Sequence, residues 1–137
     1  MASCSRNLAD GWGLTLTTSK TSPPKRGEIY SVDFTTSTGH EMSGLHPCVV
    51  VQNDVGNKFS GLTIVVVVTS NLRVASLPIG VFVKGGVGSL IRDSVINCGH
   101  IYTVDKSRLA RRIGQLPSDI IAEVDQALAR SLALTNS

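Results

Sequence analysis

The sequence has few aromatic residues, few cysteines and no long apolar run. It contains one tryptophan, two tyrosines and three phenylalanines among 137 residues. Its longest apolar run, 64–68, is far shorter than a membrane span and is typical of a buried strand. No basic start followed by an apolar stretch marks a secretory signal. These absences predict a cytoplasmic protein with no membrane partner.

The three cysteines, Cys4, Cys48 and Cys98, cannot all pair with one another, and none has a CxxC spacing. Cys48 and Cys98 lie in or beside β-rich runs, which favours small buried thiols. The sequence therefore predicts no metal site and no cofactor.

Charged residues make up 17% of the chain and apolar residues 42%, which is typical of a globular domain rather than a disordered chain. The net charge of +3 gives a mild preference for polyanions. Four basic residues gather near the end, and two interpretations stay open for them: a solvated face or a phosphate-contacting patch. They are Lys106, Arg108, Arg111 and Arg112.

The chain divides at residue 25. Residues 1–24 are rich in Ser, Thr, Gly and Asn, which indicates a flexible leader, and residues 25–135 form the predicted domain. Apolar and β-branched runs within that domain predict strands, and polar stretches predict loops. The predicted strands are 27–34, 48–51, 62–68, 78–83 and 94–96, the last extending towards 101, with loops over 35–44, 53–61 and 71–77.

The apolar spacing changes after Pro117. Ile120, Val124 and Leu128 recur at helical intervals, and Asp119 favours the positive end of a helix. Short strands followed by one terminal helix predict a mainly β domain, with a strongly bent sheet or small barrel and a C-terminal helix.

Three ordered groups of segments resemble the MazF/PemK/Kid family of toxins. Each segment alone is weak, but their order and spacing over most of the chain make the resemblance specific. The first group is Arg26-Gly27-Glu28-Ile29-Tyr30, Gly39-His40-Glu41 and Gly44-Leu45-His46-Pro47; the second is 49–54 and 66–70; the third is 92–96, 103–106, 112–114 and the last helix.

This resemblance implies an SH3-like small barrel of the MazF/PemK/CcdB type and the toxin of a type II toxin–antitoxin system. It further implies a homodimer that cuts single-stranded RNA, mRNA included, at short sequences without a metal ion, and a MazE-like antitoxin that blocks the site. The RNA's own 2′-hydroxyl would be the nucleophile, giving 2′,3′-cyclic phosphate and 5′-hydroxyl ends.

The resemblance places the family's catalytic arginine at the position of His46. Histidine is shorter than arginine, lacks its fork and is only partly charged at neutral pH. Three interpretations stay open: a change that disarms the toxin, a natural residue with an altered mechanism, or a binder that has lost cleavage. Thr69 and Ser70 match a second catalytic landmark, and the alternative is a strand-end turn in which their hydroxyls bond the backbone. Glu41 matches an acidic loop position, a candidate base.

Further residues are candidates for contacts with RNA. His40 matches a histidine of the Kid branch, Asn53 a loop asparagine, and His100 the position of a base-contacting glutamine. Lys58 and Arg73 are loop cations placed to attract phosphate, and Tyr102 has the aromatic face that stacks on bases. Each also has a plain structural or solvated alternative.

The sequence departs from the Kid pattern at a second place, because Asn97 and Gly99 stand where that branch has an arginine and an aspartate. Together with His46, this departure supports a competing function: a non-catalytic member of the fold that binds antitoxin, nucleic acid or a protein target. A structural domain with no role in nucleic-acid binding is the third alternative.

Overall fold

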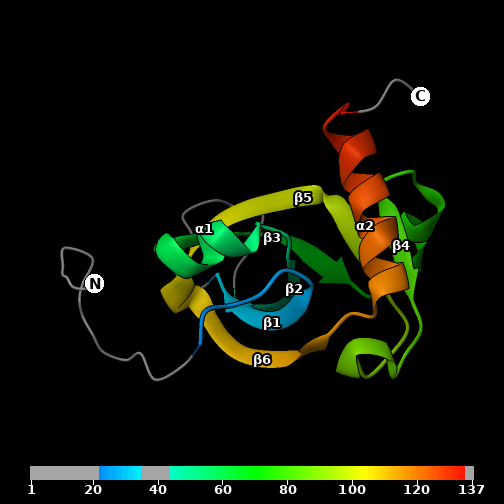
Figure 1. Ribbon diagram of the computed structural model, residues 1–137. Helices are drawn as coiled ribbons and strands as arrows, with labels where there is room; N and C mark the ends of the chain where they lie inside the picture. Colours follow the sequence, from blue (N-terminus) through cyan, green and yellow to red (C-terminus); the bar gives the residue numbers. More distant parts are fainter. Residues whose placement is uncertain (1–21, 35–43, 135–137) are drawn as a thin grey trace.

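The sheet is built around β3 (Leu62–Thr69), shown in the computed structural model of Figure 1, which describes residues 22–34 and 44–134. Its valines alternate between two apolar clusters, because successive side chains of a strand point to opposite faces. Val66 and Val68 join one cluster with Ile29 and Ile96. Val65 joins the other cluster, so β3 is buried on both faces, as the sequence predicts.

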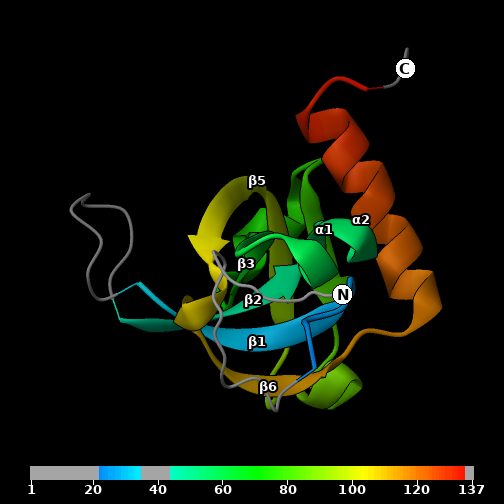
Figure 2. The same ribbon diagram turned by 60° about the vertical axis from the view of Figure 1, so that its left-hand side comes forward.

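Six antiparallel strands form the sheet in the order β4-β5-β3-β2-β1-β6. The mainly β fold with a C-terminal helix is confirmed, and Figure 2 shows how strongly the sheet curls. The remaining strands are β1 (Glu28–Asp33), β2 (Leu45–Val50), β4 (Gly80–Val83), β5 (Ser94–Asp105) and β6 (Leu109–Gln115).

The sequence did not predict β6, and it predicted β5 too short. Strand β6 is an edge strand that carries two arginines and pairs with β1 through two register shifts, so its apolar alternation is weak. Strand β5 has a bulge, because Val66 faces Ile101 whereas Val67 faces Asn97. The residues between them, 98–100, have no partner on β3, and the strand bends there.

Helix α2 (Ser118–Ser131) begins where the sequence predicts it and buries Val124 and Ala127. Figure 1 shows α2 beside β4 and one end of β5. None of the described helices is long and apolar enough to cross a membrane.

The prediction of a loop over 53–61 was wrong, because residues 54–59 form helix α1 (Asp54–Phe59). The Asn53 side chain caps this helix by accepting a hydrogen bond from the Gly56 amide at 2.8 Å. Three short 3-10 helices complete the described elements: η1 (Leu72–Ser76), η2 (Val87–Ser89) and η3 (Lys106–Arg108).

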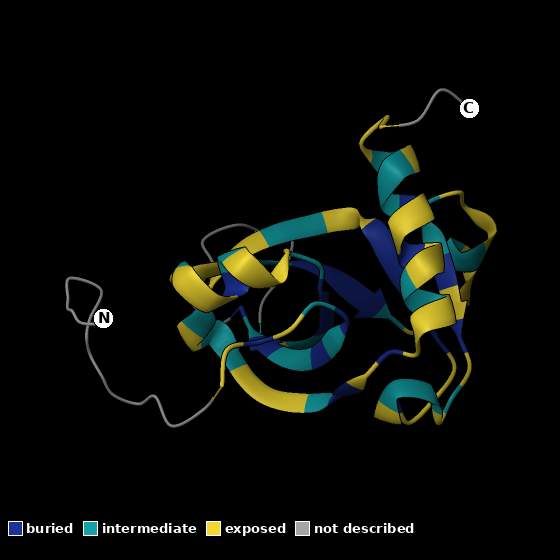
Figure 3. Cartoon of the chain, in the orientation of Figure 1, coloured by how far each residue is buried: buried dark blue, intermediate teal, exposed yellow. Residues whose placement is uncertain are grey.

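Both described cysteines are buried thiols, as the sequence predicts. Burial raises the pKa of Cys98 to about 11 and the pKa of Cys48 to about 12. Figure 3 shows that buried residues concentrate along the strands, whereas the outer surface of α1 is exposed.

Candidate active site

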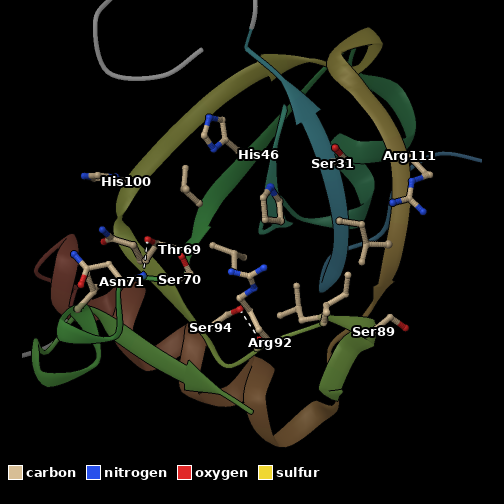
Figure 4. Close-up of a pocket in the computed structure, with 18 residues that line it drawn as sticks. Ser31, His46, Thr69, Ser70, Asn71, Ser89, Arg92, Ser94, His100 and Arg111 are labelled. Atoms are coloured by element: carbon tan, nitrogen blue, oxygen red, sulfur yellow. Dashed lines mark hydrogen bonds between the residues drawn. The ribbon is translucent and has the colours of Figure 1, made fainter. Parts of the chain in front are cut away.

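A cleft of about 900 Å³ opens where β2 begins and β3 ends (Figure 4). All five residue types in its polar lining, Ser, Thr, Asn, His and Arg, can donate hydrogen bonds. Among the described residues, no aspartate or glutamate lines it. The polar lining consists of Ser31, His46, Thr69, Ser70, Asn71, Ser89, Arg92, Ser94, Asn97, His100 and Arg111.

This composition gives the cleft a positive electrostatic bias and many hydrogen-bond donors, which suit an anionic ligand such as phosphate. The described residues contain no group of three or more His, Cys, Asp or Glu side chains placed to hold a metal ion. The hydroxyl, amide, imidazole and guanidinium groups of the lining can bind a ligand by hydrogen bonds, and the imidazoles can also transfer protons.

Thr69 and Ser70 lie on the cleft wall at the end of β3 (Figure 4). The Thr69 hydroxyl accepts a hydrogen bond from the Asn71 amide at 3.1 Å, and the Asn71 side chain accepts one from the Arg73 amide at 3.2 Å. These bonds form the tight exit from the strand into η1. The turn leaves the half-buried Thr69 and the exposed Ser70 beside the cleft.

His46 lies near the start of β2, opposite Val32 of β1, and is half-buried at the edge of the cleft. Its ring lies tilted against Phe34, with 6.0 Å between the ring centroids. Phe34 in turn packs against Tyr102 at 5.3 Å. Position 46 thus presents an imidazole held against an apolar cluster, and Tyr102 is part of that cluster's packing.

Arg92 and Arg111 reach the cleft. The sequence predicts no site role for Arg92, and for Arg111 it leaves a solvated face and a phosphate-contacting patch as alternatives. Figure 4 shows the Arg92 side chain pointing into the middle of the cleft, from the loop before β5, and Arg111 on the β6 side. Register places Arg111 in a row with Ser31 and Pro47, which also line the cleft. The available signal was that Arg92 belongs to one of the segments that carry the family resemblance.

The four clustered basic residues do not form one patch. Lys106 donates hydrogen bonds to the carbonyl oxygens of Asn57 and Ser60, and Arg112 forms an ion pair with Glu28 at 2.8 Å. Of the four, Arg111 alone lines the cleft. The strand and turn geometry therefore separates residues that the sequence places together.

His100 lines the cleft from the bulge of β5 and is exposed. The buried Asn97 side chain stabilises this bulge by accepting a hydrogen bond from the Gly99 amide at 2.9 Å. A side chain at Gly99 would meet Asn97 Oδ1 at 3.2 Å and Ile79 Cδ1 at 3.3 Å. Asn97 and Gly99, the two residues that depart from the Kid pattern here, therefore contact each other and together shape the bulge that carries His100.

The structure places three other candidates away from the cleft lining, and two outside the described residues. Asn53 caps α1; Lys58 is on α1 rather than on a loop, 5.4 Å from the Phe59 ring centroid, in a separate hollow. Arg73 lies in η1. His40 and Glu41 lie outside the described residues. The roles of these five residues in RNA binding or catalysis stay predictions.

Comparison with known proteins places this geometry among bacterial toxins. Residues 25–132 match the family described as PemK-like, MazF-like toxin of type II toxin–antitoxin system. Endoribonuclease EndoA of Bacillus subtilis is 41% identical over 110 residues, which are 80% of this chain and 95% of that protein. MazF of Deinococcus radiodurans superposes with a TM-score of 0.69 at 28% identity, over 82% of this chain and 99% of that one. A MazE–MazF complex from the same organism is equally similar, with 84% and 100% covered.

Proposed function

The chain belongs to the family of PemK-like, MazF-like toxins of type II toxin–antitoxin systems, and we propose that its cleft cleaves single-stranded RNA. It is an endoribonuclease toxin whose domain spans residues 25–135. The observation that carries this function is the cleft lined by hydroxyls, imidazoles and guanidinium groups, with no carboxylate among its described lining residues. A polyanion such as RNA fits this surface, whereas a cationic ligand needs charges of the opposite sign.

The reaction needs no group from outside the protein and the RNA. The 2′-oxygen of the RNA forms a bond to the adjacent phosphorus while the bond from phosphorus to the 5′-oxygen breaks. One base takes the proton from the 2′-hydroxyl and one acid delivers a proton to the departing 5′-oxygen. The products are a 2′,3′-cyclic phosphate and a 5′-hydroxyl.

Thr69 and Ser70 donate hydrogen bonds to the phosphate oxygens, since their hydroxyls lie at the wall of the cleft. His46 exchanges a proton with the reacting oxygens, because an imidazole nitrogen can either accept or donate a proton, whereas the guanidinium group of arginine only donates hydrogen bonds. Glu41 is the candidate partner in proton transfer. His40, Asn53, Lys58, Arg73 and His100 are the proposed contacts to the RNA beyond the reacting phosphate.

The same proposal covers the partners. The toxin acts in the cytoplasm as a homodimer, and a MazE-like antitoxin inhibits it. The MazE–MazF complex from Deinococcus radiodurans supports the antitoxin as a partner, because its MazF chain has a similar fold and is 28% identical.

The test gives the purified protein a long single-stranded RNA in the presence of a chelator, and then identifies the ends of the products. We expect cleavage with cyclic phosphate ends. Thr69→Val should lower the rate by about 10-fold to 100-fold, because it removes one donor to the transition state. Thr69→Ser should retain most of the rate. Thr103→Val is the matched control, because Thr103 is an exposed threonine of β5 outside the cleft.

His46→Arg separates this function from the competing one. Cleavage by His46→Arg without any cleavage by the parent would show that the parent is a toxin disarmed by the histidine at position 46. If neither protein cuts any RNA, the endoribonuclease function is wrong. Cleavage that the chelator abolishes would contradict the metal-independent reaction.

A further inference from the structure

We propose that Arg92 binds the scissile phosphate and supplies the guanidinium group that the family places at position 46. This inference rests on the proposed function and adds a catalytic residue to it. Figure 4 shows the Arg92 side chain in the middle of the cleft, between the wall that carries Ser70 and the wall that carries Ser89. The imidazole of His46 lies at the edge of the same cleft.

The loop that carries Arg92 is fixed by the two residues that directly follow it. The Asp93 carboxylate accepts a hydrogen bond from the Gly85 amide at 2.8 Å. The hydroxyl of Ser94, itself buried, donates to the Arg92 carbonyl oxygen at 2.8 Å. These contacts hold the backbone at Arg92, and an ordered backbone lowers the entropic cost of placing the guanidinium group.

The start of the same loop is anchored against β6. Leu90 is buried in the core, and its carbonyl oxygen accepts a hydrogen bond from the Gly86 amide at 2.6 Å. The backbones of Gly88 and Gly114 approach so closely that a side chain at Gly114 would lie 2.1 Å from the Gly88 carbonyl oxygen. Gly88 and Ser89 both have positive φ angles, 63° and 67°. A loop shaped this tightly directs its next residues, including Arg92, toward the cleft.

The guanidinium group of Arg92 has no ion-pair partner among the residues that the structure describes, whereas two other arginines do. Arg26 pairs with Asp125 at 2.6 Å and Arg112 pairs with Glu28 at 2.8 Å. Those two side chains hold parts of the fold together. Arg92 makes no such contact within 22–34 and 44–134, so its charge is available to a ligand.

Arginine suits the reacting phosphate because its planar fork donates two parallel hydrogen bonds to two phosphate oxygens. Arginine side chains keep their positive charge in proteins. With the fixed charge at position 92, proton transfer is the role that remains for the imidazole at position 46. In this proposal Arg92 holds the phosphate and His46 transfers the proton.

The experiment compares Arg92→Gln with Arg111→Gln, which removes the same charge from the opposite wall of the cleft. Single-turnover cleavage of a long single-stranded RNA is measured with chelator present. We expect Arg92→Gln to lower the rate about 100-fold and Arg111→Gln to lower it less than about 5-fold. Adding His46→Arg to Arg92→Gln should restore binding of the RNA but not the cleavage rate, because the guanidinium group returns while the imidazole that transfers the proton is lost.

Binding to a short, uncleavable 2′-O-methyl RNA of random sequence provides a second readout. Arg92→Gln should weaken binding. It should also reduce the slope of the logarithm of the binding constant against the logarithm of the salt concentration by about 0.7, the value for one phosphate contact on a single strand. Arg92→Lys should keep that salt dependence but not the cleavage rate, because lysine has the charge without the fork. Circular dichroism checks that each variant folds.

Equal losses from Arg92→Gln and Arg111→Gln, or an Arg92→Gln variant as fast as the parent, would overturn the proposal. If the parent and His46→Arg both fail to cut, the proposed function has failed, and binding decides about Arg92. In that case, if RNA binding by Arg92→Gln depends on salt as strongly as binding by the parent, Arg92 does not contact the phosphate.

Discussion

The two ends of the curled sheet carry positive charge in different ways. At the α1 end, Lys106 donates to the carbonyl oxygens of Asn57 and Ser60, at 2.6 and 2.9 Å, and thereby closes the C-terminus of the helix. At the cleft end, Arg92 and Arg111 contact no carboxylate among the described residues. The difference teaches that a basic residue is available to RNA only where the fold gives it no partner.

Polar residues follow the same division. Thr63 is fully buried near α1 and donates to Asn57 Oδ1 at 2.6 Å, whereas Thr69, on the same strand, lies beside the cleft. The Asn57 amide donates in turn to the Gln52 carbonyl oxygen at 2.9 Å. One end of β3 is therefore committed to stability, and the other end is available for chemistry.

Asn57→Leu should have the largest effect on stability. It removes the partner of the buried Thr63 hydroxyl, so we expect the free energy of unfolding to fall by about 3 kcal/mol. Urea denaturation measures this change. In the double variant with Thr63→Val the loss should be smaller than the sum, since both partners are then absent. A variant as stable as the parent would show that the network contributes nothing.

Lys106→Met should lower the stability of the fold but not the rate of cleavage, which is the reverse of what we expect for Arg92→Gln. It keeps the apolar stem but removes two charged hydrogen bonds to carbonyl oxygens, so the expected loss is about 1–2 kcal/mol of stability. The rate of RNA cleavage per folded molecule should not change. Thermal unfolding and single-turnover cleavage are measured on the same samples. A fall in rate with no fall in stability would contradict the division between the two ends.

Asp105→Asn should have the smallest effect, and only above the unfolded pKa of the Asp105 carboxyl group, where the parent carries the charge. The hydrogen bond from the Ser107 amide, with smaller contributions from Arg108 and Lys106, lowers the pKa of the Asp105 carboxyl group. The native pKa lies below the unfolded one, so the carboxylate stabilises the fold above the unfolded pKa, near 3.8. This stabilisation is lost as the pH falls through the native pKa.

The parent should therefore lose more stability than Asp105→Asn between pH 5 and pH 2, while asparagine preserves the capping contact. Urea midpoints over this range measure the difference. Parallel curves for the two proteins would show that the carboxylate contributes no pH dependence.

The sequence predicts most strands, the last helix and the cleft threonine, because these depend on local patterns. Alternating and β-branched residues mark β1 and β3, and the turn chemistry after β3 leaves Thr69 and Ser70 at a strand end. The sequence did not predict helix α1, because this helix is short. One of the side chains that bond its ends, Lys106, lies far along the chain from Asn53 and the helix. Nor did the sequence predict the bulge of β5, because it depends on Asn97 and Ile79.

The sequence by itself determined the strand pattern, the family and the unusual histidine at position 46. Only the tertiary structure decided which charges are available for binding. The partners of Lys106 and Arg112 lie 49 and 84 residues away along the chain, so no local pattern shows that these cations are already used. The loop that directs Arg92 into the cleft is likewise fixed by contacts between η2 and β6. Position 46 lacks an arginine, and the fold brings one to the cleft from position 92.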